Sequence, residues 1–216
     1  MSEQISRRNF LKTGCLAAAA VGVTLCGGTA LVGTRQPAVD QPNTTYGNGN
    51  DGPRLLVAYA TRAGSTAEVA ARIGDTLAGG GRRVDVRPAG TVDDVRPYQA
   101  VVVGSAIRMG SLLPEAMRFI EKHQADLLQR SFSAFVVCLD MATPDETTLQ
   151  TVSAYLDPVR ALVPPAHAGL FAGVMNPDKL SLLDRMIAVN MIQSPVGDFR
   201  RWDQIDAWAA GLGVAG

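Results

Sequence analysis

Tyr59-Ala60-Thr61-Arg62-Ala63-Gly64-Ser65-Thr66 joins a continuous apolar run, residues 55–60, to residues 66–77, whose apolar side chains recur at helical spacing. The run predicts a buried strand and the following segment predicts a helix. Residues 61–66, which we call the phosphate loop, contain three hydroxyl groups, one glycine and one arginine, and no acidic side chain. Hydroxyls and free backbone N–H groups at a helix N-terminus favour a bound phosphate, and Gly64 lets the backbone close around it.

The phosphate loop differs from two common nucleotide motifs. It lacks the Gly-Lys-Ser/Thr ending of triphosphate loops and the Gly-x-Gly-x-x-Gly of dinucleotide folds. A simple helix cap with no ligand is the alternative, because caps use the same residue types.

Strand-like and helix-like segments alternate along the rest of the body. Further strands are expected at residues 83–87, 100–103, 132–139 and 167–174, and helices at 113–128, 145–162, 179–192 and 202–212. We expect 83–87 to be an edge strand and Pro158 to split its helix. The alternation predicts an α/β fold, a doubly wound five-stranded parallel sheet with helices on both faces. Ligands of such folds bind at the carboxyl ends of the strands.

The N-terminus has the form of an export signal. Ser6-Arg7-Arg8-Asn9-Phe10-Leu11-Lys12 resembles the twin-arginine consensus and precedes an uncharged run that ends at Thr34. We therefore expect an extracytoplasmic protein exported by the twin-arginine route. It is soluble if the signal is cleaved, for example after Ala30, and membrane-anchored if the signal is retained. Residues 1–34 are assigned to this signal or anchor, 35–53 to a flexible linker rich in Gly, Pro and Asn, and 54–216 to the folded domain.

Composition excludes several classes of protein. Lysine plus arginine balances aspartate plus glutamate at 20 each among 216 residues, so nothing indicates nucleic-acid binding. Of the three cysteines only Cys138 lies in the body, where we expect a small core residue. Two histidines and one body cysteine predict no metal site, and His123 is expected to be solvated.

The spacing of the phosphate loop closely resembles the FMN signature of flavodoxins. The matching positions are aromatic Tyr59, then Thr61, Gly64 and Thr66, followed by Ala70 and Ile73. The resemblance implies a flavodoxin-like fold with FMN as cofactor, its phosphate bound by Thr61, Arg62, Ala63, Gly64, Ser65 and Thr66. Ala58 stands where the family usually has a larger apolar residue, which we expect to alter strand packing only.

A second loop resembles a narrower branch, the flavodoxin-like quinone-dependent protoporphyrinogen oxidases of bacteria. The match begins at Gly104-Ser105-Ala106-Ile107-Arg108-Met109-Gly110 and includes Phe119 to His123, Asp184 to Ile187, Gly197-Asp198 and Trp202. It implies that Ser105, Ala106, Ile107, Arg108, Met109 and Gly110 line one face of the flavin ring. Arg108 would then favour the reduced, anionic flavin, or else it is a solvent-facing or ion-paired loop residue.

The turn after the 132–139 strand is expected at the other face of the ring. Asp140 and Met141 lie there, at a position where many flavodoxins have an aromatic residue. Met141 would stack more weakly on the ring, and Asp140 is alternatively a cap of the following turn.

Three functions remain open. The first is an FMN-dependent oxidoreductase of the protoporphyrinogen oxidase type, with unidentified catalytic residues, which moves electrons from a reduced donor to a quinone or another acceptor. The second is an exported flavodoxin-type electron carrier that serves a redox partner protein and has no substrate of its own. The third is a flavin-free binding or scaffold domain. Membrane association is expected through the N-terminal segment or the apolar 179–192 helix, for which a buried helix is the alternative.

Overall fold

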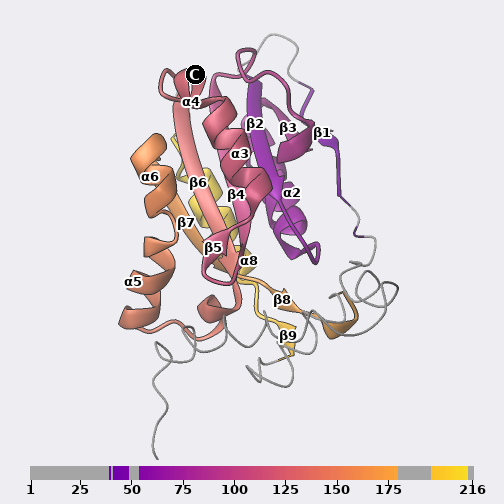
Figure 1. The fold of residues 1–216 in the computed structure, drawn as a ribbon. Helices are drawn as coiled ribbons and strands as arrows, with labels where there is room; N and C mark the ends of the chain where they lie inside the picture. Colours follow the sequence, from indigo (N-terminus) through magenta and orange to yellow (C-terminus); the bar gives the residue numbers. More distant parts are fainter. Residues whose placement is uncertain (1–38, 40, 49–53, 180–195, 214–216) are drawn as a thin grey trace, which may run out of the picture.

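A central sheet of five parallel strands organises the computed structural model, which describes residues 39, 41–48, 54–179 and 196–213. The parallel strands are β2 (Arg54–Ala60), β3 (Arg83–Pro88), β4 (Ala100–Arg108), β6 (Ser131–Cys138) and β7 (His167–Ala172). They lie side by side in the order β3-β2-β4-β6-β7, and each neighbouring pair is parallel (Figure 1). The predicted doubly wound fold is confirmed.

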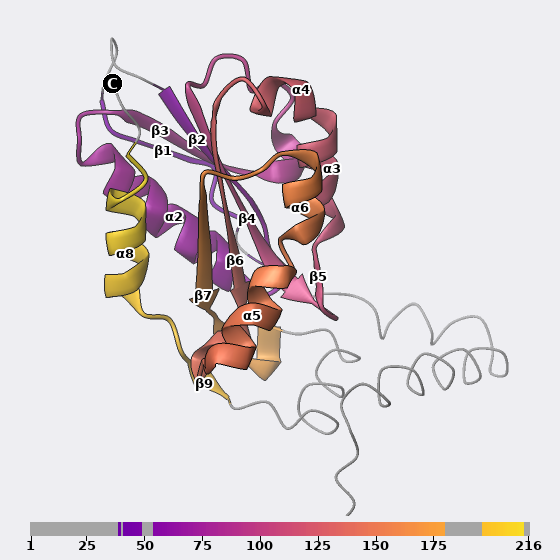
Figure 2. The same cartoon turned by 90° about the vertical axis from the view of Figure 1, so that its left-hand side faces the viewer.

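Helices cover both faces of the sheet (Figure 2). One face carries α2 (Ser65–Ala78) and α8 (Trp202–Ala210). The other carries α3 (Pro114–Lys122), α4 (Gln124–Leu127), α5 (Glu146–Ala154) and α6 (Asp157–Leu162). Pro158 splits the helix that it interrupts, as predicted, because α5 ends before it and α6 begins with proline in its first turn.

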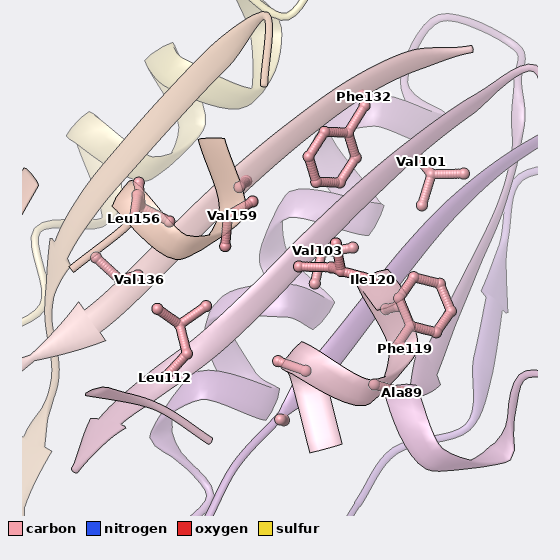
Figure 3. Packing of buried hydrophobic residues seen from close by; sticks show 14 of the residues in the cluster. Ala89, Val101, Val103, Leu112, Phe119, Ile120, Phe132, Val136, Leu156 and Val159 are labelled. Carbon is pink, nitrogen blue, oxygen red and sulfur yellow. The ribbon is translucent and has the colours of Figure 1, made fainter. Parts of the chain in front are cut away.

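Two hydrophobic clusters hold these layers together. On the α3 and α6 side, Figure 3 shows Val101 and Val103 of β4 packed near Ile120 of α3, with Leu156 and Val159 beside β6. On the other side, Val69 and Ile73 of α2 and Ile205 of α8 pack on the sheet. Burial on both faces explains why the central strands read as continuous apolar runs.

A further strand, β1 (Thr44–Tyr46), pairs antiparallel with β3, with Thr44 opposite Val86 and Tyr46 opposite Val84. The expectation that residues 83–87 form an edge strand was therefore wrong. The strand also lies within residues 35–53, which the sequence suggested were a flexible linker. Composition gave no sign of it because the bonds that hold it are made with residues 40 or more positions away.

The strand β4 is longer than predicted and continues past Val103 to Arg108, where a tight turn leads into β5 (Ser111–Leu112). Beyond β7, the short strands β8 (Val174–Met175) and β9 (Gly197–Asp198) form a separate antiparallel pair. Short 3-10 helices follow β3, β6 and β8, at Ala89–Thr91, Leu139–Ala142 and Pro177–Lys179.

Of the apolar helix predicted at residues 179–192, only Lys179 is described, within the last of these 3-10 helices. Residues 180–192 lie outside the described part, as does the N-terminal export segment. Within the described ranges, no helix combines the length and apolar character needed to cross a membrane.

Two single-residue predictions had different outcomes. Cys138 is buried in the core, as predicted, and burial raises the pKa of its thiol to about 11. His123 is only 5% exposed, so the prediction of a solvated residue was wrong. The helix ends at Lys122, and the turn into α4 places the His123 ring against Phe119, with a centroid separation of 4.8 Å.

Candidate functional site

Three predicted segments meet at the carboxyl edge of the sheet. Strand register places Ala60, just before the phosphate loop, opposite Ser105 of β4. Ala106 then lies opposite Val137, two residues before the turn that contains Asp140 and Met141. The phosphate loop, the β4–β5 hairpin and the turn after β6 are therefore neighbours along one edge, where ligands of doubly wound folds bind.

The phosphate loop is bent so that it leads directly into α2. Gly64 adopts φ 95°, a left-handed conformation that costs glycine little. Its N–H donates to the hydroxyl of Thr61 at 3.0 Å, and its carbonyl accepts the N–H of Glu68 at 3.1 Å. The first backbone N–H groups of this 14-residue helix consequently point toward the loop.

Thr66 is the residue that most clearly indicates a ligand. Its side chain is completely buried, and its Oγ1 has no hydrogen-bond partner among the described residues. A buried hydroxyl without a partner is unfavourable by about 1–3 kcal/mol. A phosphate oxygen at the start of α2 would supply the missing partner, so the residues present fit a phosphate group. Gly173 adds to the cradle, because a Cβ there would stand 3.4 Å from Ser65 Oγ.

Arg62 forms an ion pair with a residue of α3. Its guanidinium donates to both carboxylate oxygens of Glu115, in the first turn of α3, at 2.9 and 3.1 Å. Burial favours the neutral acid, but the backbone N–H of Glu115 and the Arg62 guanidinium outweigh burial and hold the pKa of Glu115 below its ordinary value. The described geometry thus gives Arg62 a bridging role between the phosphate loop and α3.

Arg200 is a site residue that the sequence did not single out. Its side chain is 9% exposed, pairs with Glu68 in the first turn of α2, and donates to Asp198 of β9 at 2.6 Å. These hydrogen bonds lower the pKa of Asp198, and the guanidinium also lies over the Trp202 ring at 4.5 Å. Arg200 thereby neutralises a carboxylate that would otherwise oppose an anion at this helix terminus. Glu68 and Arg200 are 132 residues apart, so no local pattern indicated the pair.

The β4–β5 hairpin contains the next group of predicted residues. Ser105 is completely buried, and its hydroxyl donates to the carbonyl of Ala106 at 2.8 Å and accepts the N–H of Leu113 at 2.9 Å. Both bonds are internal to the hairpin and the start of α3. Ala106 and Ile107 are partly buried, and Arg108 is exposed.

Met109 and Gly110 form the tip of this hairpin, with φ 52° and 75°. Two consecutive positive φ angles are what a two-residue hairpin turn requires, but methionine rarely adopts one. The Met109 side chain is 80% exposed. The tip therefore presents a large apolar side chain to its surroundings at the carboxyl edge.

The two predicted site residues in the turn after β6 differ in their exposure to solvent. Asp140 is exposed, whereas Met141 is only 8% exposed and packs into the core. Met141 also lines a cavity of about 300 Å³ with residues of α5, β7 and the start of α8, among them Leu149, Phe171 and Arg201. Among the described residues, no group of three or more His, Cys, Asp or Glu side chains is placed to hold a metal ion.

Comparison with known proteins identifies a family for most of the chain. The family model described as a flavodoxin domain matches residues 56–201. Protoporphyrinogen IX dehydrogenase (quinone) of Escherichia coli strain K12 is 23% identical over 167 residues, which cover 72% of this chain and 92% of that protein.

One solved structure shows the same fold, and a second is reported for comparison. A short-chain flavodoxin associated with a bacterial microcompartment superposes with a TM-score of 0.50 at 15% identity, covering 74% of this chain and 96% of that one. A flavodoxin of Streptococcus pneumonia TIGR4 gives a TM-score of 0.47 at 21% identity, covering 74% and 97%.

Proposed function

Because the chain belongs to the flavodoxin domain family, we propose that it is an exported FMN-dependent oxidoreductase that passes electrons from a reduced donor to a quinone. Family membership assigns FMN as the cofactor and electron transfer as the class of function. The likeness to a quinone-dependent protoporphyrinogen IX dehydrogenase supports the choice of acceptor, at 23% identity. When bound, FMN supplies the capacity to accept and release electrons.

The unpartnered hydroxyl of Thr66 carries the argument for a bound cofactor. A helix cap that serves only the fold would use its hydroxyl within the protein, as Thr61 does when it accepts the Gly64 N–H at 3.0 Å. Thr66 is equally well buried, yet its hydroxyl bonds to nothing in the described chain. This difference favours a flavoprotein over a flavin-free scaffold domain.

Different segments around the site bind different parts of the cofactor. The phosphate loop and the first turn of α2 bind the phosphate, and Arg200 removes the opposing charge of Glu68. The hairpin tip, with Arg108 and Met109, covers the ring from the β4 side. Met141 is 8% exposed and packs in the core, so we expect it to stack less on the ring than an exposed aromatic residue would.

The second candidate is an electron carrier that serves a partner protein. The exposed Met109 favours it, because a protruding apolar side chain at the redox edge suits a transient protein contact. The two candidates differ in whether the isolated protein turns over a small substrate.

Export by the twin-arginine route accords with this chemistry, since that route carries folded proteins with their cofactors already bound. Replacing Arg7 and Arg8 with lysine should keep the flavin-loaded protein in the cytoplasm. Cell fractionation with a flavin absorbance reading tests this, and unchanged export of the variant would contradict the proposal.

The visible absorption spectrum of the purified chain, with the released cofactor identified by mass, tests the central claim. We expect one FMN per chain. Steady-state oxidation of protoporphyrinogen with added quinone then separates the two candidates, because only the enzyme turns over. A colourless protein that also fails to bind added FMN would overturn both.

A further inference from the structure

Val39 and residues 41–48, which we call the leading segment, pack against the domain ahead of β2. Within it, Thr45 donates to Asp85 at 2.6 Å, and Arg87 donates to the carbonyl of Thr44 at 2.6 Å. The Tyr46 ring lies against Gly74 of α2, where a Cβ would come within 3.2 Å of it. These contacts fix the segment along the outer edge of β3, as Figure 1 shows.

The direction of β1 brings the start of the leading segment to the cofactor site. Because β1 is antiparallel to β3, residues upstream of Thr44 lie toward the carboxyl edge. Two contacts confirm this position. The hydroxyl of Tyr59, two residues before Thr61, donates to the carbonyl of Pro42 at 2.8 Å. Val39 Cγ1 lies 3.0 Å from the place that a Cβ on Gly64 would occupy.

We propose that Val39 and Pro42 are positioning residues of the FMN phosphate site. Val39 lies against Gly64, the residue whose left-handed conformation shapes the loop, and Pro42 holds the strand end from which the loop departs. Together they keep the phosphate loop in its anion-binding conformation and exclude water from its outer side. This inference rests on the proposed FMN function. The family match begins at residue 56, so Val39 and Pro42 lie outside the matched region.

A charge placed at residue 39 tests how close the leading segment is to the bound phosphate. Val39→Asp and Val39→Asn have nearly the same size and differ in one negative charge. In the full chain, we expect the aspartate variant to bind FMN about tenfold more weakly than the asparagine variant at low salt, with the difference shrinking as salt is added. Riboflavin has no phosphate and should bind both variants equally, which excludes a general loss of folding.

A matched pair of tyrosines tests the positioning role separately. Tyr59→Phe removes the hydroxyl bonded to Pro42, and Tyr98→Phe removes a buried hydroxyl that donates to Asp85 at 2.9 Å. Both changes should lower the melting temperature. Only Tyr59→Phe should increase the rate of FMN release, by several-fold. Stopped-flow fluorescence after dilution of the FMN complex measures this rate.

The inference holds only if both pairs differ in the expected direction. Equal FMN affinities of the two Val39 variants, or equal FMN release rates of the two tyrosine variants, would overturn it while leaving the proposed function intact. A parent chain that binds no FMN would overturn the proposed function and this inference together.

Discussion

The two ends of the central sheet use buried polar groups in opposite ways. Near the amino ends of the strands, Asp85 is completely buried and accepts hydrogen bonds from Thr45, Arg54, Arg87 and Tyr98 at distances between 2.6 and 3.1 Å. At the carboxyl edge, Thr66 is equally buried and its hydroxyl has no partner within the described chain. The Asp85 carboxylate is thus fully satisfied within the fold, whereas the Thr66 hydroxyl is left available to a ligand.

Backbone strain distinguishes the carboxyl edge at one residue. Among the described residues, Met109 at the tip of the β4–β5 hairpin is the one non-glycine residue with a positive φ. Strain of this kind is typical of functional sites and is tolerated where the rest of the structure compensates for it. The Asp85 cluster, defined as Thr45, Arg54, Asp85, Arg87 and Tyr98, supplies such compensation by joining β1, β2 and β3 to Tyr98, which lies two residues before β4.

The sharpest test of this comparison removes the carboxylate of the Asp85 cluster. Asp85→Ala leaves Arg54 and Arg87 without their shared partner in a partly buried place. Breaking a buried ion pair in this way costs about 3–5 kcal/mol of unfolding free energy. Urea denaturation of Asp85→Ala and of the parent measures this loss of unfolding free energy. FMN affinity of the folded fraction should fall only a few-fold, because Asp85 helps to fix the leading segment through Thr45. A loss of tenfold or more would mean that the two ends of the sheet are strongly coupled.

As a control, Asp94→Ala removes an exposed carboxylate that pairs with Arg96. Its melting temperature should equal that of the parent.

The Asp85 cluster also predicts a pH dependence. Burial acts to raise the pKa of the Asp85 carboxyl, but hydrogen bonds from Thr45, Arg54 and Tyr98 and the charge of Arg87 hold it below the ordinary value of 3.8. Below that pH the unfolded chain takes up a proton before the folded chain does, so stability is lost as the solution becomes more acidic. Melting temperatures of the parent and of Asp85→Asn between about pH 6 and pH 3 should converge; parallel curves would contradict this.

Two threonines give a matched comparison of the two ends. Thr66→Val removes an unpartnered hydroxyl, so the cofactor-free protein should be as stable as the parent or slightly more stable, while FMN binds about 10–100-fold more weakly. Thr45→Val removes a hydroxyl bonded to Asp85, so stability should fall by about 1–2 kcal/mol. FMN affinity should fall much less than in Thr66→Val, because backbone pairing with β3 still holds the leading segment. Thermal melts and FMN fluorescence titrations measure both. If both variants changed stability and FMN affinity in the same way, the proposed difference between the two ends of the sheet would be wrong.

A smaller effect is expected from the neutralising arginine. Arg200→Met removes the closer of two cationic partners of Glu68 in the first turn of α2 and leaves Lys179 at 4.0 Å, so FMN should bind about 3–10-fold more weakly at low salt. Arg72→Met is the control, because Arg72 lies on the same helix and pairs with Asp206 at 2.6 Å, away from the phosphate loop. Titrations at two salt concentrations distinguish the variants. Equal losses of FMN affinity in the two variants would mean that the effect comes from a less stable α2 helix.

The smallest expected effect concerns the hairpin tip. Asparagine before glycine suits a turn with two positive φ angles, so Met109→Asn should stabilise the protein by about 0.5–1 kcal/mol. If Met109 serves the acceptor, the same change should lower the second-order rate of electron transfer and leave FMN affinity unchanged. Stopped-flow reduction of a quinone measures this rate. A faster electron transfer in Met109→Asn would mean that Met109 does not contact the electron acceptor.

The fold class and the order of its elements were what the sequence predicted best. Residues 61–66 join β2 to α2, so their composition indicates what that loop can bind, whereas residues 104–108 lie within β4 itself. Helical and strand periodicities placed α2, β2 and the split at Pro158 for the same reason, since each depends on near neighbours in the chain. The ends of β4 were harder to predict, because pairing with β5 extends the strand to Arg108.

Long-range polar contacts were beyond sequence reasoning. Thr45 reads as part of a polar linker until Asp85, 40 residues later, accepts its hydroxyl. The partners Glu68 and Arg200 lie still farther apart. His123 was misjudged because its charged neighbours suggested a surface position, whereas the turn between α3 and α4 directs its ring to Phe119.

The position of Val39 also fixes how any attachment through the N-terminus would hold the molecule. Residues 35–38 span at most about 14 Å when extended, which is shorter than the roughly 30 Å diameter of a domain of this size. If the apolar export run stays in a lipid bilayer, the phosphate loop must remain close to the headgroups while the Asp85 cluster faces away from them. The path of the leading segment would then decide which end of the sheet a lipid-dissolved electron acceptor can reach.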